Sequence, residues 1–200
     1  MDPFVHLHVA SGYSRQYGVS HPHVLVERAA EHEMDTLALT DRDGTYGAVK
    51  HALACRAAGL RPVLGVDLAV RPVGPAGHPA VPEQKPRTPV RGGAFRDDRR
   101  VPRVTFLADA SHAGGRAGWA AVCRLVSAVQ LAGERGAPVA DLAVLAPWLE
   151  SGDVTVLLGP ASEVGAALAR RRDDLARAAL EPWLEVVPRA NLLVELVSHR

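Results

Sequence analysis

Two histidines near the amino terminus, His6 and His8, have the residue type and the spacing of metal ligands. They lie in an apolar run, residues 4–9, that predicts a strand, and residues two apart in a strand point to the same face. Two imidazoles on one face could share a metal ion. The spacing fits equally well one polar core histidine and one partly exposed histidine.

Further polar residues stand where later predicted strands end. They are Asp41, Arg42, Asp43, Asp67 and His199. The carboxyl ends of parallel strands meet on one side of an α/β fold, and working residues gather there. We therefore expect these residues to share one pocket with the amino-terminal histidines, although the set is thin for a metal site.

Several common catalytic signatures are absent from the sequence. It has no GxxxxGK[ST] phosphate loop, no GxSxG nucleophile motif and no GxGxxG dinucleotide fingerprint. Its two cysteines, Cys55 and Cys123, lie in alanine-rich helical stretches without CxxC spacing. A disulfide framework or a zinc knuckle is therefore not expected.

The composition is that of a globular protein. Of 200 residues, 48% are hydrophobic and 22% are charged, which predicts a single domain over residues 1–200. The formal net charge of +1 gives no global field for nucleic acid or membrane. Asp2 and His6 interrupt any signal peptide, and no run of about 18 apolar residues could cross a bilayer. We expect a soluble, cytoplasmic protein.

The predicted elements alternate between strands and helices. The strands are residues 4–9, 36–40, 62–70, 103–108, 153–158 and 192–197, and the helices are residues 22–30 (with Ser20 as N-cap), 46–58, 119–131, 163–171 and 174–186. Such alternation predicts βαβ units and a parallel sheet, in an α/β barrel or an open doubly wound fold. Because the sequence stops soon after a strand, a barrel would be incomplete at its carboxyl end.

The stretch between residues 71 and 102 differs from the rest of the chain. It holds seven of the fifteen prolines, several arginines and almost no periodicity. We expect a Pro/Arg-rich insertion loop on the surface.

The first seventy residues are the most specific part of the sequence. They contain HLHVASGYSRQYGVSHP (6–22) and LALTDRDGTYGAVKHALACRAAGLRPVLGVDLAV (37–70), and RVTFLADA (103–110), VCRLVSAVQLAG (122–133) and LLVELVSH (192–199) follow. These runs resemble the N-terminal PHP domain of bacterial DNA polymerase III alpha subunits. The turn TDRDGTYG (40–47) is most similar to the error-prone, translesion-type paralogues of actinobacteria. The resemblance implies a PHP-type distorted (β/α)7 barrel.

The resemblance also implies which positions would hold metal. Active members of that family bind a cluster of metal ions for phosphoester hydrolysis, including 3′–5′ proofreading. Their ligand positions match His8 and, with a shorter side chain, Asp67. The other ligand positions fall on Ala10, Tyr17, Arg42, Arg103 and Pro160. His6 is not a family ligand, and the closing Asp-x-His motif would lie beyond Arg200.

Guanidinium groups cannot coordinate a metal and do not lose their proton. We therefore expect a metal-free, vestigial pocket in which Arg42 and Arg103 pair with Asp41, Asp43 or Asp67. No catalytic residue and no cofactor are expected in this segment, and His8 and Asp67 are the weak candidates for a metal.

Three functions follow from the resemblance. The first is a scaffolding PHP module of a polymerase III alpha-type subunit in replication or error-prone repair. Its partners would be DNA reached through the parent polymerase, the other polymerase domains and accessory subunits, and Mg²⁺ would belong to the parent's palm. The second is a Zn²⁺- or Mn²⁺-dependent phosphoesterase or 3′–5′ exonuclease using His6, His8, Asp67 and His199. The third is a free-standing inactive remnant.

Overall fold

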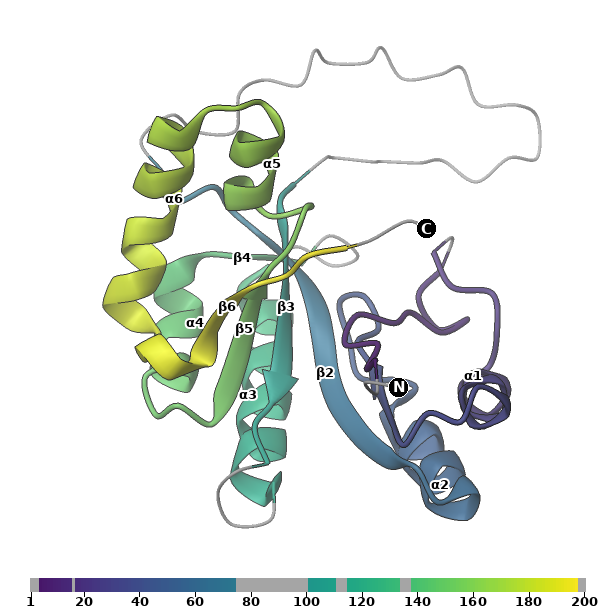
Figure 1. The fold of residues 1–200 in the computed structure, drawn as a ribbon. Helices are drawn as coiled ribbons and strands as arrows, with labels where there is room; N and C mark the ends of the chain where they lie inside the picture. The colour runs from purple at the N-terminus through teal and green to yellow at the C-terminus, as the bar shows by residue number, and fades with distance from the viewer. Residues whose placement is uncertain (1–3, 16, 75–100, 111–114, 134–137, 198–200) are drawn as a thin grey trace, which may run out of the picture.

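The computed structural model describes residues 4–15, 17–74, 101–110, 115–133 and 138–197. Helices and strands alternate along most of it (Figure 1). The elements are α1 (Pro22–Glu31), β1 (Thr36–Leu39), α2 (Ala48–Ala58), β2 (Arg61–Val70), β3 (Arg103–Ala108), α3 (Arg116–Ala132), β4 (Val139–Ala140), α4 (Leu142–Leu149), β5 (Val154–Leu158), α5 (Glu163–Ala169), α6 (Asp173–Val186), a 3-10 turn (Arg189–Asn191) and β6 (Leu192–Val194).

The strands form one mixed sheet in the order β1-β2-β3-β5-β6, with β4 paired to β2. β1 is parallel to β2, and β5 is parallel to β6, but β3 runs antiparallel to both β2 and β5. The predicted α/β class is confirmed, whereas the prediction of a wholly parallel sheet was wrong. Hydrophobic runs mark strands without giving their direction, and an antiparallel return needs no crossover helix. Within the described residues the sheet is open and its path does not close into a complete barrel.

The first predicted strand, residues 4–9, is not a regular strand. Its backbone runs beside β1 and accepts two hydrogen bonds, from Ala38 N to His6 O and from Thr40 N to Val9 O. The Val9 backbone amide donates its hydrogen bond to the Thr40 hydroxyl oxygen, at 3.0 Å, and not to a backbone carbonyl of β1. The ladder is therefore interrupted by a side chain, and the strict alternation of faces that would pair His6 with His8 does not apply.

The predicted helices are present with shifted boundaries. Helix α1 begins at Pro22, so that His21 and not Ser20 is the N-cap residue, because proline is favoured in the first helical position. Helix α2 ends where predicted, since Gly59 adopts the left-handed conformation with φ 74°. The sequence analysis missed β4 and α4. The strand has only two residues, and the helix contains Pro147, which would ordinarily predict a break.

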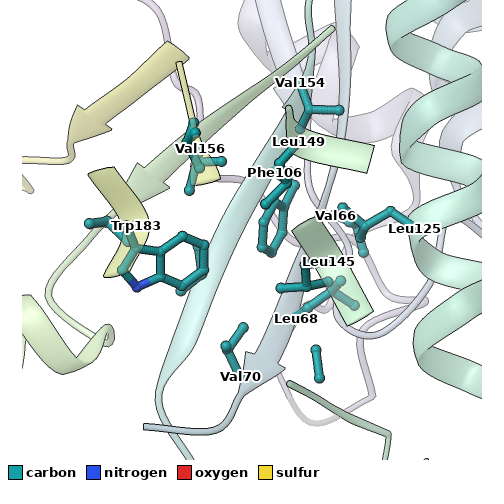
Figure 2. Packing of buried hydrophobic residues seen from close by; sticks show 14 of the residues in the cluster. Val66, Leu68, Val70, Phe106, Leu125, Leu145, Leu149, Val154, Val156 and Trp183 are labelled. Carbon is teal, nitrogen blue, oxygen red and sulfur yellow. The ribbon is translucent and has the colours of Figure 1, made fainter. Parts of the chain in front are cut away.

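The helices cover the sheet in two groups. In Figure 1 the amino-terminal segment, α1 and α2 lie on one side of β2, and helices α3 to α6 lie on the other. The larger core lies under the second group, where Phe106 and Trp183 meet with ring centroids 6.3 Å apart (Figure 2). Phe106 is fully buried, and Leu68 on the neighbouring strand is buried with it. The sheet carries Asp67, Arg103 and Thr105 of the site on β2 and β3.

Two sequence predictions fall partly or wholly outside the described residues. The expected insertion loop is described only at residues 71–74 and 101–102, and the predicted site residue His199 lies outside the described residues. The last predicted strand is shorter than expected, since β6 ends at Val194.

Candidate functional site

A pocket of about 230 Å³ opens where β5 ends, where the chain leaves β6 and where β3 begins. Because β3 is antiparallel to its neighbours, its first residues lie beside the last residues of β5 and β2. The pocket is lined by His8, Arg103, Thr105, Gly159, Pro160, Ala161, Glu195 and Val197. The site therefore lies on the side of the sheet that the strand-end argument predicts, and it includes two of the predicted residues, His8 and Arg103.

Asp67 on β2 is the buried anion beside this pocket. Its side chain is only 2% exposed, and its Oδ2 atom accepts a hydrogen bond from Arg103 Nε at 2.8 Å. Arg42 Nε lies 3.3 Å from the same oxygen, and His8 Nε2 lies 3.9 Å from it. Burying a carboxylate costs several kcal/mol unless it is paired, so the two guanidinium groups stabilise the buried Asp67 carboxylate.

Arg103, the first residue of β3, joins two carboxylates. Beyond its bond to the Asp67 side chain, its terminal nitrogen donates to Asp43 Oδ1 at 2.9 Å and to the Asp67 carbonyl at 2.7 Å. Burial, the largest single influence, lowers the pKa of Arg103, but the Asp67 and Asp43 carboxylates together raise it above its ordinary value. Its side chain is 13% exposed, so this is a nearly buried, permanently charged bridge.

Arg42 follows β1 and is held from two sides. Its guanidinium carbon lies 3.2 Å from the centroid of the Tyr17 ring, a cation–π contact, while Nε faces Asp67. Tyr17 and Arg42 occupy two positions at which the family resemblance expects ligands, and here they contact each other. The guanidinium occupies the space between the aromatic ring and the buried carboxylate.

His8 links the two ends of the described chain. Its Nδ1 atom lies 3.2 Å from Glu195 Oε2, just after β6, and the Thr105 hydroxyl lies 3.4 Å from the same nitrogen. The hydrogen bond with Glu195 is the main cause that raises the pKa of His8 above 6.5, and the nearby Asp67 carboxylate adds to it. The sequence analysis missed Glu195 because the last strand was predicted to continue past it. An acidic residue near a strand end was the signal available.

Of the three carboxylates named as possible partners of the arginines, Asp43 and Asp67 are paired with them, whereas Asp41 is bonded to two serines. The Asp41 carboxylate is buried and accepts hydrogen bonds from the Ser11 backbone amide at 2.7 Å and from the hydroxyl groups of Ser11 and Ser14. Among the described contacts, it accepts none from a guanidinium group. These bonds fasten the 11–18 loop to the end of β1. The serine hydroxyls already satisfy this anion, which leaves the arginines to Asp67 and Asp43.

His6 lies outside the pocket. Its exposed ring packs edge-on against Phe4, with centroids 4.8 Å apart, and it is not among the pocket residues. Of the two arrangements that the His6/His8 spacing left open, the structure has the one in which the two histidines do not share a site. His199 lies outside the described residues.

These side chains do not suit the metal cluster that the resemblance implies. Asp67 Oδ1 is buried without a hydrogen-bond partner among the described residues, which offers one free ligand atom. The other oxygen already receives two guanidinium groups, and their positive charge opposes a second and third cation. The described part of the chain holds no group of three or more His, Cys, Asp or Glu side chains arranged for a metal.

Comparison with known proteins identifies the family of this chain. The family model described as "PHP domain" matches residues 6–199. An error-prone DNA polymerase of Mycolicibacterium paratuberculosis is 32% identical over 199 residues, covering 98% of this chain and 16% of that protein. The error-prone DNA polymerase of Cutibacterium acnes is 34% identical over 201 residues, covering 99% and 16%. The chain thus spans about a sixth of the length of these relatives.

Among solved structures, a putative metal-dependent phosphoesterase from Bifidobacterium adolescentis is similar with a TM-score of 0.48 and 13% identity, over 94% of this chain and 79% of that one. In the described part of the chain, none of the helices combines the length and the apolar character needed to cross a bilayer. The match of the family model over almost the whole sequence shows that the chain belongs to the PHP domain family.

Proposed function

We propose that this chain is the N-terminal PHP module of a DNA polymerase III alpha-type subunit of the error-prone class, with a vestigial pocket that is structural and not catalytic. One observation supports the structural role of the pocket. Arg42 and Arg103 both contact the same buried oxygen of Asp67, so the protein's own cations supply the positive charge that the family's metals would bring.

The assignment to a polymerase III alpha-type subunit rests on the sequence relatives. Two proteins called error-prone DNA polymerase match nearly the whole chain at 32% and 34% identity, and the chain corresponds to a sixth of their length. Nucleotidyl transfer and its Mg²⁺ would belong to the rest of such a polymerase. This module would support the neighbouring domains and accessory subunits in the cytoplasm, and DNA would be reached through the parent polymerase.

The phosphoesterase or exonuclease alternative has less support. It needs His6, His8, Asp67 and His199 as ligands, with Zn²⁺ or Mn²⁺. His6 is exposed against Phe4, and His8 is bonded to Glu195. What remains for a metal is one free oxygen of Asp67 and a histidine nitrogen 3.9 Å from its other oxygen.

Metal content separates the two readings. The 200-residue chain is purified from medium supplemented with Mn²⁺ and Zn²⁺, and bound metal is measured by inductively coupled plasma mass spectrometry. Hydrolysis of bis(p-nitrophenyl) phosphate with added Mn²⁺ is the activity assay. We expect metal far below one ion per chain and no Mn²⁺-dependent hydrolysis. Stoichiometric metal with hydrolysis that Asp67→Asn abolishes would overturn the structural role.

The genomic reading frame tests the polymerase assignment separately. An open frame that continues past the Arg200 codon into an aspartate-rich polymerase palm is the expected result. A stop codon at that position would favour a free-standing remnant, and the polymerase assignment would have to be withdrawn.

A further inference from the structure

The amino-terminal part of the chain carries a surface of aromatic rings, imidazoles and basic side chains that does not belong to the pocket. We define the ring surface as Tyr13, Arg15, His21, His23 and Lys50, which come from the 11–18 loop, the start of α1 and the exposed side of α2. In Figure 1 these elements lie together, on the opposite side of β2 from helices α3 to α6.

The rings of this surface are arranged face to face and edge to face. His21 and His23 are stacked, with an interplanar angle of 11° and centroids 5.9 Å apart, and both residues are exposed. Tyr13 stands edge-on to His21 at 6.4 Å. Because both residues are exposed, a flat partner can reach the stacked pair from its outer side.

Positive charge accompanies the rings. Lys50 Nζ lies 5.2 Å from the centroid of Tyr13 and donates to its hydroxyl. Arg15 is exposed on the same loop. In the described part of the chain neither Lys50 nor Arg15 forms an ion pair with a carboxylate, unlike Arg103 in the pocket.

Negative charge is missing from the segments that build this surface. Residues 4–26 and 44–66 contain no Asp or Glu, although the whole chain has 22 acidic residues against 23 basic ones. The first acidic residue of α1 is Glu27, one turn beyond His23. The carboxylates nearest to the surface are those of buried Asp41, which is bonded to Ser11 and Ser14, and of Glu27. On the exposed side of these segments, positive charge therefore exceeds negative charge.

We propose that the ring surface binds a single nucleic-acid strand, with bases stacked on the exposed rings of His21 and His23 and with phosphates held by Lys50 and Arg15. Exposed rings beside cations that have no carboxylate partner are the combination that recognises single strands without regard to sequence. An acidic peptide would use the cations but would leave the stacked imidazoles without a role, so the nucleic acid fits more of the surface. The inference goes beyond the proposed function, because it assigns this chain a strand contact of its own.

Fluorescence anisotropy with a labelled oligo(dT) of about 12 nucleotides, at low salt, tests the proposal on the 200-residue chain. We expect the double variant His21→Ala/His23→Ala to weaken binding by about 5-fold or more, because two stacking surfaces are removed. Lys50→Glu should also weaken binding and lower the slope of log affinity against log salt by roughly one. The melting temperature of each variant checks that exposed substitutions leave the fold intact.

Two matched control variants test whether the loss of binding is specific to the ring surface. His32→Ala removes an exposed imidazole at the other end of α1, and Arg177→Glu makes the same charge change as Lys50→Glu at an exposed position of α6. Both should bind within about 2-fold of the unaltered chain. The proposal is wrong if the chain does not bind oligo(dT), if the controls lose as much affinity as the surface variants, or if duplex DNA binds as tightly as the single strand. Metal content plays no part in these outcomes, so this proposal and the proposed function can fail separately.

Discussion

Replacing Arg103 by methionine tests whether the pocket is held by charge neutralisation. Methionine keeps much of the side-chain volume but removes the guanidinium that bonds Asp67 and Asp43. Asp67 is 2% exposed, so it would lose its shortest ionic contact without gaining water. Removing one partner of a buried ion pair costs about 3–5 kcal/mol. Because Arg42 stays 3.3 Å from the same oxygen, we expect the lower end, about 3 kcal/mol.

Urea unfolding, followed by circular dichroism, measures this loss as a change in the free energy of unfolding. Arg177→Met, at an exposed position of α6, is the matched control and should change the free energy of unfolding by less than about 0.5 kcal/mol. Adding Asp67→Asn to Arg103→Met should recover part of the loss, since the stranded charge is then gone. A cost below about 1 kcal/mol for Arg103→Met, or no recovery in the double variant, would refute the neutralisation argument.

Three further predictions concern the core, pH and thiol chemistry. Phe106→Ala should cost about 3–5 kcal/mol in urea unfolding, because the ring is fully buried against Trp183; a cost under about 2 kcal/mol would contradict this packing. The hydrogen bond with Glu195 raises the pKa of His8 above 6.5, so its stabilisation is complete below that pH and is lost as pH rises through the folded pKa. Glu195→Gln should therefore destabilise the chain more near about pH 5.5 than near about pH 8.5, and an equal loss at both would be inconsistent with the pair. Burial raises the pKa of Cys55 to about 11, so mass spectrometry after brief iodoacetamide treatment should find native Cys55 far less alkylated than half-buried Cys123, and full labelling of both in urea.

Much of the fold follows from local patterns. The run RVTFLA became β3 with the predicted bounds, and Gly59 ends α2 because glycine adopts positive φ without strain. Hydrophobic periodicity is a property of each segment, so it predicts the segment's type. The direction of β3, the pairing of β4 with β2 and the irregular course of residues 4–9 depend on contacts between distant segments, and no local pattern encodes them.

The sequence by itself determined which charges the site would contain. His8, Asp67, Arg42 and Arg103 could be named in advance, because guanidinium groups at ligand positions are visible in the residues and their charge does not depend on the fold. Only the tertiary structure decided how those charges pair. In the folded chain, Asp41 is hydrogen-bonded to two serines, and both arginines contact Asp67. His8 is hydrogen-bonded to Glu195, a residue 187 positions away. Which anion a cation meets is a matter of distance and burial, and both exist only after the sheet has brought its strand ends together.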